Sequence, residues 1–182
     1  TKIATTQHPY RRKRMKIKVI GAGLAGCEAA YHLARQGFKV ELYDIKPNSF
    51  TPAHKSANFG ELVCSNSLKG SDPYSNACGL LKEEMRIIGS LMMEAAEYSK
   101  IPAGGALAVD RDKFSEYITD RIKAEQNITV ISEEIKKVPV APCIIATGPL
   151  TTEALSDDIC ALLGGENLHF YDASAPIVAR DS

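Results

Sequence analysis

Two groups of residues in this chain of 182 have types and spacings that suit chemistry. The first is GAGLAG, in which Gly21, Gly23 and Gly26 form the GxGxxG pattern of loops that hold a pyrophosphate against backbone N–H groups. The second is GELVCSNSLKG, where Cys64 has small polar neighbours and no apolar face of a helix or strand to join. The first group predicts a nucleotide site, and the second leaves the purpose of the thiol open.

The elements around the glycines are those of a βαβ unit of about 30 residues. An apolar strand over residues 16–20 precedes the loop, a helix with a small-residue face follows to Gly37, and FKVELYD is a second strand. In this context the first glycine permits a tight turn, the second lets the backbone approach a pyrophosphate, and the third allows close packing of helix on strand. Asp44 ends the second strand, where a carboxylate can accept hydrogen bonds from a ribose. The predicted dinucleotide-binding residues here are Gly21, Ala22, Gly23, Leu24, Ala25, Gly26 and Asp44. The alternative is a glycine-rich turn with a structural role alone.

The later segment APCIIATGPL helps to separate FAD from NAD. In oxidoreductases with two dinucleotides, a later strand ending in ATG returns to the first nucleotide site, and Ala146, Thr147 and Gly148 match that ending. We therefore expect FAD, bound by an α/β, three-layer, Rossmann-like domain of the FAD/NAD(P)-binding, glutathione-reductase type.

The remaining pattern predicts a long polar loop over residues 48–76, which at that length is expected to be functional. One helix, capped by Ser75 or Asn76, is expected to run to Pro102 with a core stripe of Leu81, Met85, Ile88, Met92 and Ala95. Further elements are expected as follows: a strand at GGALAV, a helix capped by Asp110, an antiparallel pair of NITVIS with EEIKKV, a buried strand at APCIIATG, a helix at TTEALSDDICALLG with Leu155, Ile159 and Leu162 on one face, and a strand at HFYDASAPIV.

Composition is that of a globular protein, with 45% apolar and 24% charged residues. No apolar run reaches the length of a membrane span and no secretory signal opens the chain, so we expect a cytoplasmic protein. The five cysteines form no CxxC pair and are expected to be free thiols, with Cys27, Cys143 and Cys160 as packing residues. The four histidines stand at no zinc-ligand spacing, so no metal site is expected.

Charge is uneven, because residues 1–14 carry five basic side chains and no acid, while the rest has 17 basic and 22 acidic residues, a net charge of −5. We interpret residues 1–14 as a disordered extension upstream of Met15, with a basic RNA-contacting arm as the alternative.

Several strings, in this order and spacing, resemble the folate-dependent tRNA (uracil-5-)-methyltransferase family, TrmFO, from Met15 to the last residue. They are GAGLAGCEAA, TPAH, ELVCSNSLKG, LLKEEMR, IPAGGALAVDRDKF, IIATGPLT and FYDASAPIV. The resemblance implies a flavoprotein that forms 5-methyluridine in the T-loop of tRNA, with 5,10-methylenetetrahydrofolate as the carbon donor. NAD(P)H reduces the FAD, and the reduced flavin supplies electrons that turn the transferred methylene into a methyl group.

The resemblance also implies a role for Cys64, which matches a functional cysteine held near the flavin ring. The alternative is a thiol that only packs under the flavin. Ser65 and Asn66 are expected to bond the edge of the isoalloxazine, and Lys69 to neutralise phosphate or substrate charge. Of the AVDR string, Asp110 and Arg111 are expected to act as a helix cap and in an ion pair.

Members of that family are longer, so the resemblance identifies this chain as an amino-terminal fragment that is inactive alone. Residues 15–165 are expected to be the first part of the FAD-binding domain, and residues 166–182 the start of a smaller insertion domain. The cysteine that attacks carbon 6 of uracil is expected beyond residue 182. Two alternatives remain: the related FAD-dependent family that modifies the wobble uridine of tRNA, and a non-catalytic FAD-binding fragment.

Overall fold

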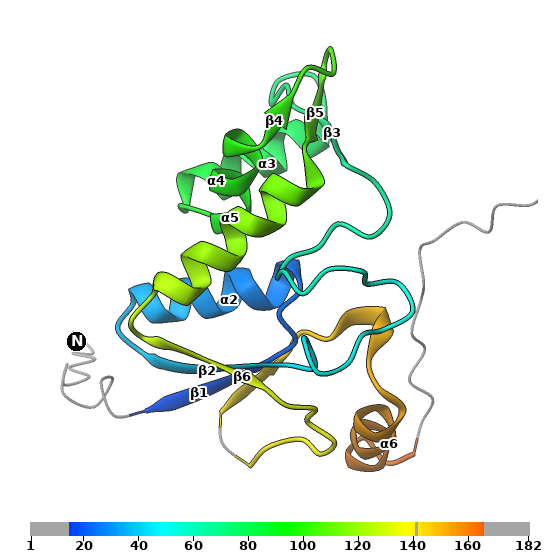
Figure 1. The fold of residues 1–182 in the computed structure, drawn as a ribbon. Coiled ribbons are helices and arrows are strands. Elements are labelled where there is room, and N and C mark those ends of the chain that lie inside the picture. Colours follow the sequence, from blue (N-terminus) through cyan, green and yellow to red (C-terminus); the bar gives the residue numbers. More distant parts are fainter. Residues whose placement is uncertain (1–14, 141, 166–182) are drawn as a thin grey trace, which may run out of the picture.

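The computed structural model describes residues 15–140 and 142–165. Its centre is a parallel sheet in the order β6-β2-β1-β7 (Figure 1). The strands are β1 (Lys16–Ile20), β2 (Lys39–Asp44), β6 (Ile128–Ser132) and β7 (Cys143–Ile145). All three pairings are parallel, and the register places Ile20 of β1 beside Tyr43 of β2 and Ile145 of β7. The predicted α/β, Rossmann-like architecture is confirmed, and the carboxyl ends of all four strands meet at one edge of the sheet.

Two helices cover one face of this sheet, α2 (Leu24–Arg35) and α5 (Arg111–Ala124). They pack through the small and apolar side chains that their periodicity placed on one side, such as Ala30 of α2 and Ile118 of α5, both fully buried. Helix α6 (Glu153–Leu162) lies on the other side of the sheet in Figure 1 and buries Leu155. The helices thus leave the strand ends accessible between them.

A smaller layer of antiparallel strands lies beyond α5, at the top of Figure 1. Its order is β3-β5-β4, and helices α3 and α4 pack beside it. The bounds are β3 (Ser67–Gly70), α3 (Ala77–Ile87), α4 (Leu91–Tyr98), β4 (Lys100–Ile101) and β5 (Ala106–Val109). The predicted strand at GGALAV and the Asp110 cap of α5 are both confirmed, since the Asp110 carboxylate accepts the N–H groups of Asp112 and Lys113.

The single long helix predicted before Pro102 is wrong, because the chain breaks it into α3 and α4. Asn76 caps α3 as predicted, but Gly89 has φ +75° and Ser90 starts a new helix by accepting the N–H of Met93. Only the second half of the apolar stripe is core: Met92 is buried, while Leu81 and Ile88 are 56% and 66% exposed. The apolar residues recur at the spacing of one continuous helix, but they belong to two helices that pack against different neighbours.

The predicted antiparallel pair of NITVIS with EEIKKV is also wrong. NITVIS forms β6, which pairs in parallel with β2, and residues 133–138 are not in a strand. The short β7 is a half-exposed edge strand among the described residues rather than a buried one, and Cys143 and Cys160 are half-buried rather than core. On α6, Leu162 is 66% exposed and does not share the burial of Leu155. The interpretation of residues 1–14 and the strand and insertion domain expected after residue 165 lie outside the described residues.

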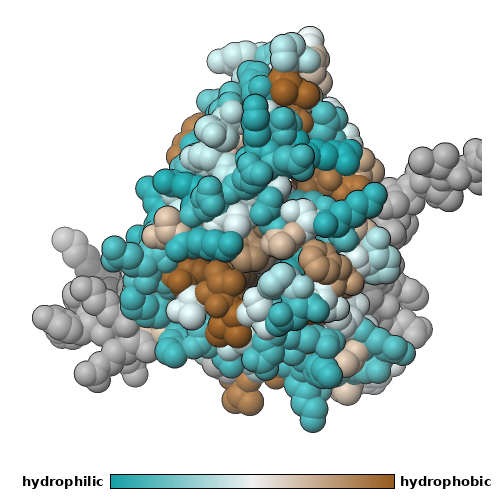
Figure 2. Space-filling view, viewed as in Figure 1, coloured by the Kyte–Doolittle hydropathy of each residue, from teal (hydrophilic) through white to brown (hydrophobic). Residues whose placement is uncertain are grey.

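Hydrophilic side chains dominate the face in Figure 2, and a hydrophobic cluster lies at its centre over the parallel sheet. Among residues 15–140 and 142–165, no helix has both the length and the apolar character that a membrane span needs.

Candidate functional site

The three glycines of GAGLAG are needed for three different reasons. Gly21 has φ +98°, and a Cβ there would lie 2.7 Å from the carbonyl oxygen of Ala146. A Cβ on Gly26 would lie only 1.8 Å from the carbonyl oxygen of Gly21. Gly23 differs, because a Cβ at this position meets no described atom within 4 Å. The fold itself explains the first and third glycines, whereas the space at Gly23 is open for something other than this chain.

Helix α2 starts directly at that open space. Gly23 is its N-cap and has no side chain, so the N–H groups of the first turn have no capping oxygen there. The first helical bond runs from the Cys27 N–H to the Gly23 carbonyl at 3.0 Å. An uncapped helix N-terminus carries partial positive charge and binds anions such as phosphate.

Asp44, at the end of β2, faces the same loop. One carboxylate oxygen accepts the N–H of Ala22 at 2.7 Å and the other accepts the N–H of Lys46 at 2.9 Å. Each carboxylate oxygen can accept more than one hydrogen bond, so these contacts fix the group without exhausting it. The predicted ribose acceptor is therefore held rigidly beside the glycine loop.

The end of β7 forms the opposite wall. The Ala146 N–H donates to the Ile20 carbonyl at 2.8 Å, so β7 continues its pairing up to the glycine loop. The Thr147 hydroxyl lies 2.6 Å from that of Thr151, and Gly148, with φ +63°, begins the short helix η1 (Gly148–Leu150). The structure thus brings the predicted ATG residues to the predicted GxGxxG loop.

These groups line one pocket at the carboxyl edge of the parallel sheet, which is where open α/β sheets bind ligands. Of the residues predicted from sequence, the lining includes Gly21, Ala22, Gly23, Asp44, Ala146 and Thr147. Leu24 and Ala25 face a separate apolar groove between α2, α3, α4 and β3, which Lys69 also lines. Gly26 packs against Gly21 behind the pocket, and neither Gly26 nor Gly148 lines it.

Sequence reasoning missed several polar residues of the pocket, and three of them lie close together in the chain: Lys46, Thr51 and His54. All three follow β2 in irregular chain, where no periodicity marks which side chains turn inward. The string TPAH contains two of them but carried no assigned role. Burial, and next the positive charge of Lys46, lower the pKa of His54, against the opposing effect of Glu61 and Asp44. His54 is consequently neutral at pH 7.

The pocket also holds a buried polar atom with nothing to bond. The hydroxyl oxygen of Thr152 is buried and has no hydrogen-bond partner among the described residues. Such an orphan group is unfavourable unless a ligand or water satisfies it. Together with the open space at Gly23 and the uncapped α2, it shows that the residues present fit a dinucleotide.

The loop that carries Cys64 runs from the glycine loop to β3 and passes the first residue of α5. At its start the Gly60 N–H donates to the Ala22 carbonyl at 2.9 Å, so the two sequence motifs meet in the fold. Further along, Arg111 donates to the Cys64 carbonyl at 3.0 Å. Cys64 itself is exposed and does not line the pocket. Arg111 was predicted to form an ion pair, but within the described part of the chain its guanidinium bonds this carbonyl instead.

Ser65 and Asn66 are engaged within the protein. The Ser65 hydroxyl accepts the N–H of Ser67 at 3.0 Å. Asn66 pairs with Val109 twice, because its carbonyl accepts the Val109 N–H at 2.9 Å and its side-chain amide donates to the Val109 carbonyl at 3.2 Å. Neither residue lines the pocket, and both hold the loop in shape.

All five cysteines lie in the described part of the chain and are free thiols, as predicted. Cys27 is fully buried behind the glycine loop, donates to the Ala22 carbonyl, and has its pKa raised by burial. It is a packing residue. Within residues 15–140 and 142–165, no group of three His, Cys, Asp or Glu side chains is placed to hold a metal ion.

Comparison with known proteins agrees with this geometry. A curated protein of Lactobacillus acidophilus, "Methylenetetrahydrofolate--tRNA-(uracil-5-)-methyltransferase TrmFO", is 56% identical over 91% of this chain and 38% of its own length. The protein of the same name from Caldicellulosiruptor bescii is 59% identical over 92% of this chain and 38% of its own length. These relatives confirm the resemblance read from the sequence, and the chain spans 38% of their length.

Among solved structures, Aquifex aeolicus GidA in its form II crystal matches with a TM-score of 0.59 and 19% identity, over 75% of this chain and 25% of that one. At this identity the match supports the fold alone. The family model "Glucose inhibited division protein A" matches residues 16–182. The chain therefore belongs to the Glucose inhibited division protein A family.

Proposed function

We propose that this chain is the FAD-binding part of a folate-dependent tRNA (uracil-5-)-methyltransferase. The observation that carries the proposal is the space at Gly23, which the fold leaves open between an uncapped helix N-terminus and the Asp44 carboxylate. A pyrophosphate needs that space, and a ribose needs that carboxylate. The names of the relatives from Lactobacillus acidophilus and Caldicellulosiruptor bescii support the reaction class.

In this proposal the pocket binds FAD, 5,10-methylenetetrahydrofolate donates the carbon, and NAD(P)H is the reductant. The product is 5-methyluridine in the T-loop of tRNA. Bound flavin supplies the electrons that convert a transferred methylene into a methyl group. The residues of this chain have simpler tasks: the glycine loop and α2 bind the pyrophosphate, and Asp44 orients the ribose.

Cys64 is proposed to act near the flavin ring, as the resemblance implies. What supports this is the way its loop is held: Gly60 is bonded to the glycine loop at one end, and Asn66 to Val109 at the other. A thiol on a loop fixed at both ends is exposed yet positioned. Ser65 and Asn66 reach a flavin edge only by exchanging or sharing their present partners.

The first test is cofactor binding by the purified chain. After saturation with FAD and gel filtration, we expect a flavin absorbance band that co-elutes with the protein, and none for Gly23→Val. A folded chain that retains no flavin contradicts the assignment of the pocket.

The second test is the reaction. This chain replaces the corresponding segment of the Lactobacillus acidophilus relative, and the chimera is incubated with tRNA that lacks 5-methyluridine, with the folate donor and NAD(P)H. We expect 5-methyluridine that depends on the folate donor, detected by mass spectrometry of nucleosides. A chimera that binds FAD but forms no 5-methyluridine contradicts the methyltransferase assignment and leaves the pocket assignment standing.

A further inference from the structure

A cluster of three residues that neither sequence motif includes lies in the nucleotide pocket. Lys46, Thr51 and His54 all line it, and they come from the irregular chain after β2. We propose that this cluster is the recognition site for the adenosine diphosphate half of the dinucleotide, with Lys46 supplying charge and His54 a directed hydrogen bond. The inference rests on the proposed function, since it presupposes that the pocket holds a dinucleotide.

Lys46 is a buried cation with no anion of its own. Only 5% of its surface is exposed, and its ammonium group donates to the carbonyl of Asn58. No carboxylate of the described residues forms an ion pair with it. A buried charge is costly unless it is paired, so a site of this kind is built for an anionic ligand.

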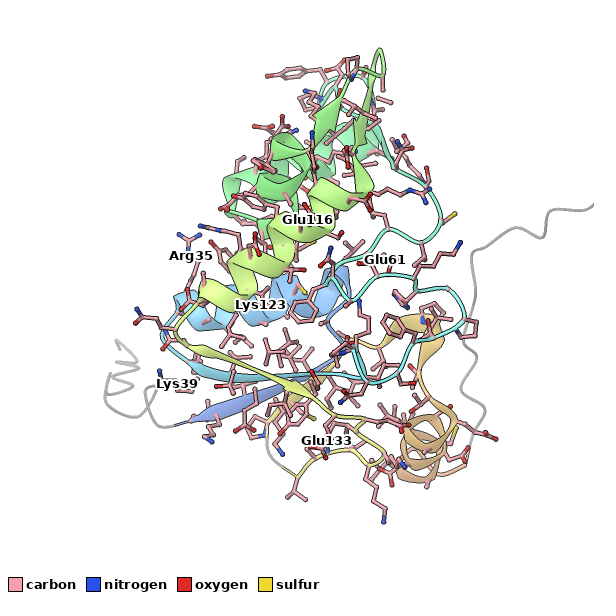
Figure 3. The ribbon with its side chains drawn as sticks, in the orientation of Figure 1. Arg35, Lys39, Glu61, Glu116, Lys123 and Glu133 are labelled. Carbon is pink, nitrogen blue, oxygen red and sulfur yellow. The ribbon has the colours of Figure 1, made fainter. Side chains whose placement is uncertain are left out.

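The acidic side chains of the pocket increase the need for the positive charge of Lys46 when an anionic ligand binds. Asp44, Glu133 and Glu134 also line it, which leaves three carboxylates facing a single lysine. Figure 3 shows Glu133 beyond the end of β6, far from Lys39 at the start of β2. Lys46 is the only lysine or arginine among the described residues that line the pocket, so without it only the N–H groups at the start of α2 offset the repulsion between these acids and a pyrophosphate.

Thr51 aims the ring of His54. The Thr51 hydroxyl lies 2.6 Å from Nδ1 of His54, which occupies that nitrogen. No described residue bonds Nε2, which leaves it as the ring nitrogen able to contact a ligand. The ring is neutral, because burial and Lys46 lower its pKa while Glu61 and Asp44 oppose this less strongly. A neutral, oriented imidazole makes one directed hydrogen bond, which suits an adenosine better than a phosphate.

The test measures ADP and FAD affinity of the full chain by titration calorimetry, in wild type and in Lys46→Met, His54→Gln, Thr51→Val and the Thr51/His54 double variant. Loss of one directed hydrogen bond predicts about tenfold weaker ADP binding for His54→Gln. Thr51→Val is expected to weaken ADP by about threefold, and the double variant to bind like His54→Gln alone, because Thr51 acts through His54. Lys46→Met is expected to weaken ADP by about a hundredfold at low salt, because a charge pair in a partly buried site is lost, and to flatten the dependence of affinity on salt.

Two controls match these variants. Lys39→Met removes a lysine from the exposed start of β2, and His32→Gln removes a histidine from α2, and neither residue lines the pocket. Both controls are expected to keep wild-type ADP affinity. Thermal unfolding of every variant separates lost binding from lost folding. If Lys46→Met does not fold, the variants Thr51→Val and His54→Gln still test the proposal, because both side chains are partly exposed.

The failures are distinguishable. If wild type binds neither FAD nor ADP, the proposed function fails. If wild type binds both, and His54→Gln and Thr51→Val bind ADP as tightly as wild type, the inference about this cluster is overturned while the proposed function survives. Additive effects of Thr51 and His54 overturn the claim that Thr51 aims the ring.

Discussion

The carboxylate of Asp44 accepts the backbone N–H of Ala22 across 2.7 Å, so the end of β2 is tied directly to the glycine loop. The same carboxylate is the predicted acceptor for a ribose. Its removal therefore acts twice, once on the shape of the loop and once on the ligand.

For Asp44→Ala we expect FAD binding weaker by about 1 to 3 kcal/mol, because a charged acceptor of hydrogen bonds is lost. Titration followed by quenching of flavin fluorescence measures it. The matched control is Glu41→Ala on the same strand, since Glu41 bonds Lys16 and Tyr43 and does not line the pocket. Equal affinity of Asp44→Ala and wild type would remove Asp44 from the site.

The glycine loop offers a sharper comparison. Gly23→Val is expected to stay folded and lose FAD, since its Cβ meets no protein atom within 4 Å but occupies the space of the pyrophosphate. Gly26→Ala is expected to lose about 3 kcal/mol or more of stability, since its Cβ would lie 1.8 Å from the Gly21 carbonyl oxygen. Chemical denaturation of the apo chains and FAD titration separate the two effects. If Gly23→Val unfolds as readily as Gly26→Ala, the open space has a structural role instead.

A third prediction concerns the contact between α2 and α4. The Glu28 carboxylate accepts the Ser90 hydroxyl at 2.8 Å, the Leu91 N–H at 3.0 Å and the Met92 N–H at 2.9 Å, so α2 caps the start of α4. Glu28→Ala is expected to lower the free energy of unfolding by about 2 kcal/mol, because several charged hydrogen bonds are lost. Glu116→Ala, an exposed change on α5 (Figure 3), is expected to cost little. Urea unfolding measures the free energy of unfolding of both variants. Equal values for Glu28→Ala and Glu116→Ala would show that the Glu28 cap contributes no net stability.

Cysteine reactivity tests the exposure of the Cys64 loop. Cys64 is exposed, whereas Cys27 is fully buried with a pKa raised by burial, so iodoacetamide is expected to modify Cys64 first and Cys27 last. Peptide mass spectrometry over a time course gives the order. Early modification of Cys27 in the folded chain would contradict the packing described around the glycine loop.

The catalytic assignment of Cys64 needs the chimera with the Lactobacillus acidophilus relative. There, Cys64→Ala is expected to keep FAD and tRNA binding but lose most methyl transfer, since alanine removes the ionisable thiol without opening a large cavity. Single-turnover methylation, normalised to bound flavin, measures it. Wild-type turnover per flavin would reduce Cys64 to a packing residue.

The sequence predicted the parts of the fold that depend on neighbouring residues. The unit from β1 to β2 was predicted because strand and helix periodicity and the three glycines are local signals. The break at Gly89 was missed, because the cap that makes it stable comes partly from Glu28, about sixty residues earlier in the chain. The pairing of β6 was wrong because its partner, β2, lies far away in sequence and leaves no local trace. The sequence also did not predict the pocket residues Lys46, Thr51 and His54. No local pattern marks them, because only the folded loop brings them into the pocket.

The closeness of Gly21 to Ala146 also bears on the order in which the protein is made. Gly21 packs against Ala146, which directly follows β7 and is synthesised about 125 residues later. A growing chain that has not reached β7 has a glycine loop without its opposite side. The nucleotide pocket can therefore be completed only after α5 and β6 have been synthesised, and a cofactor that needs both walls binds once β7 has paired with β1.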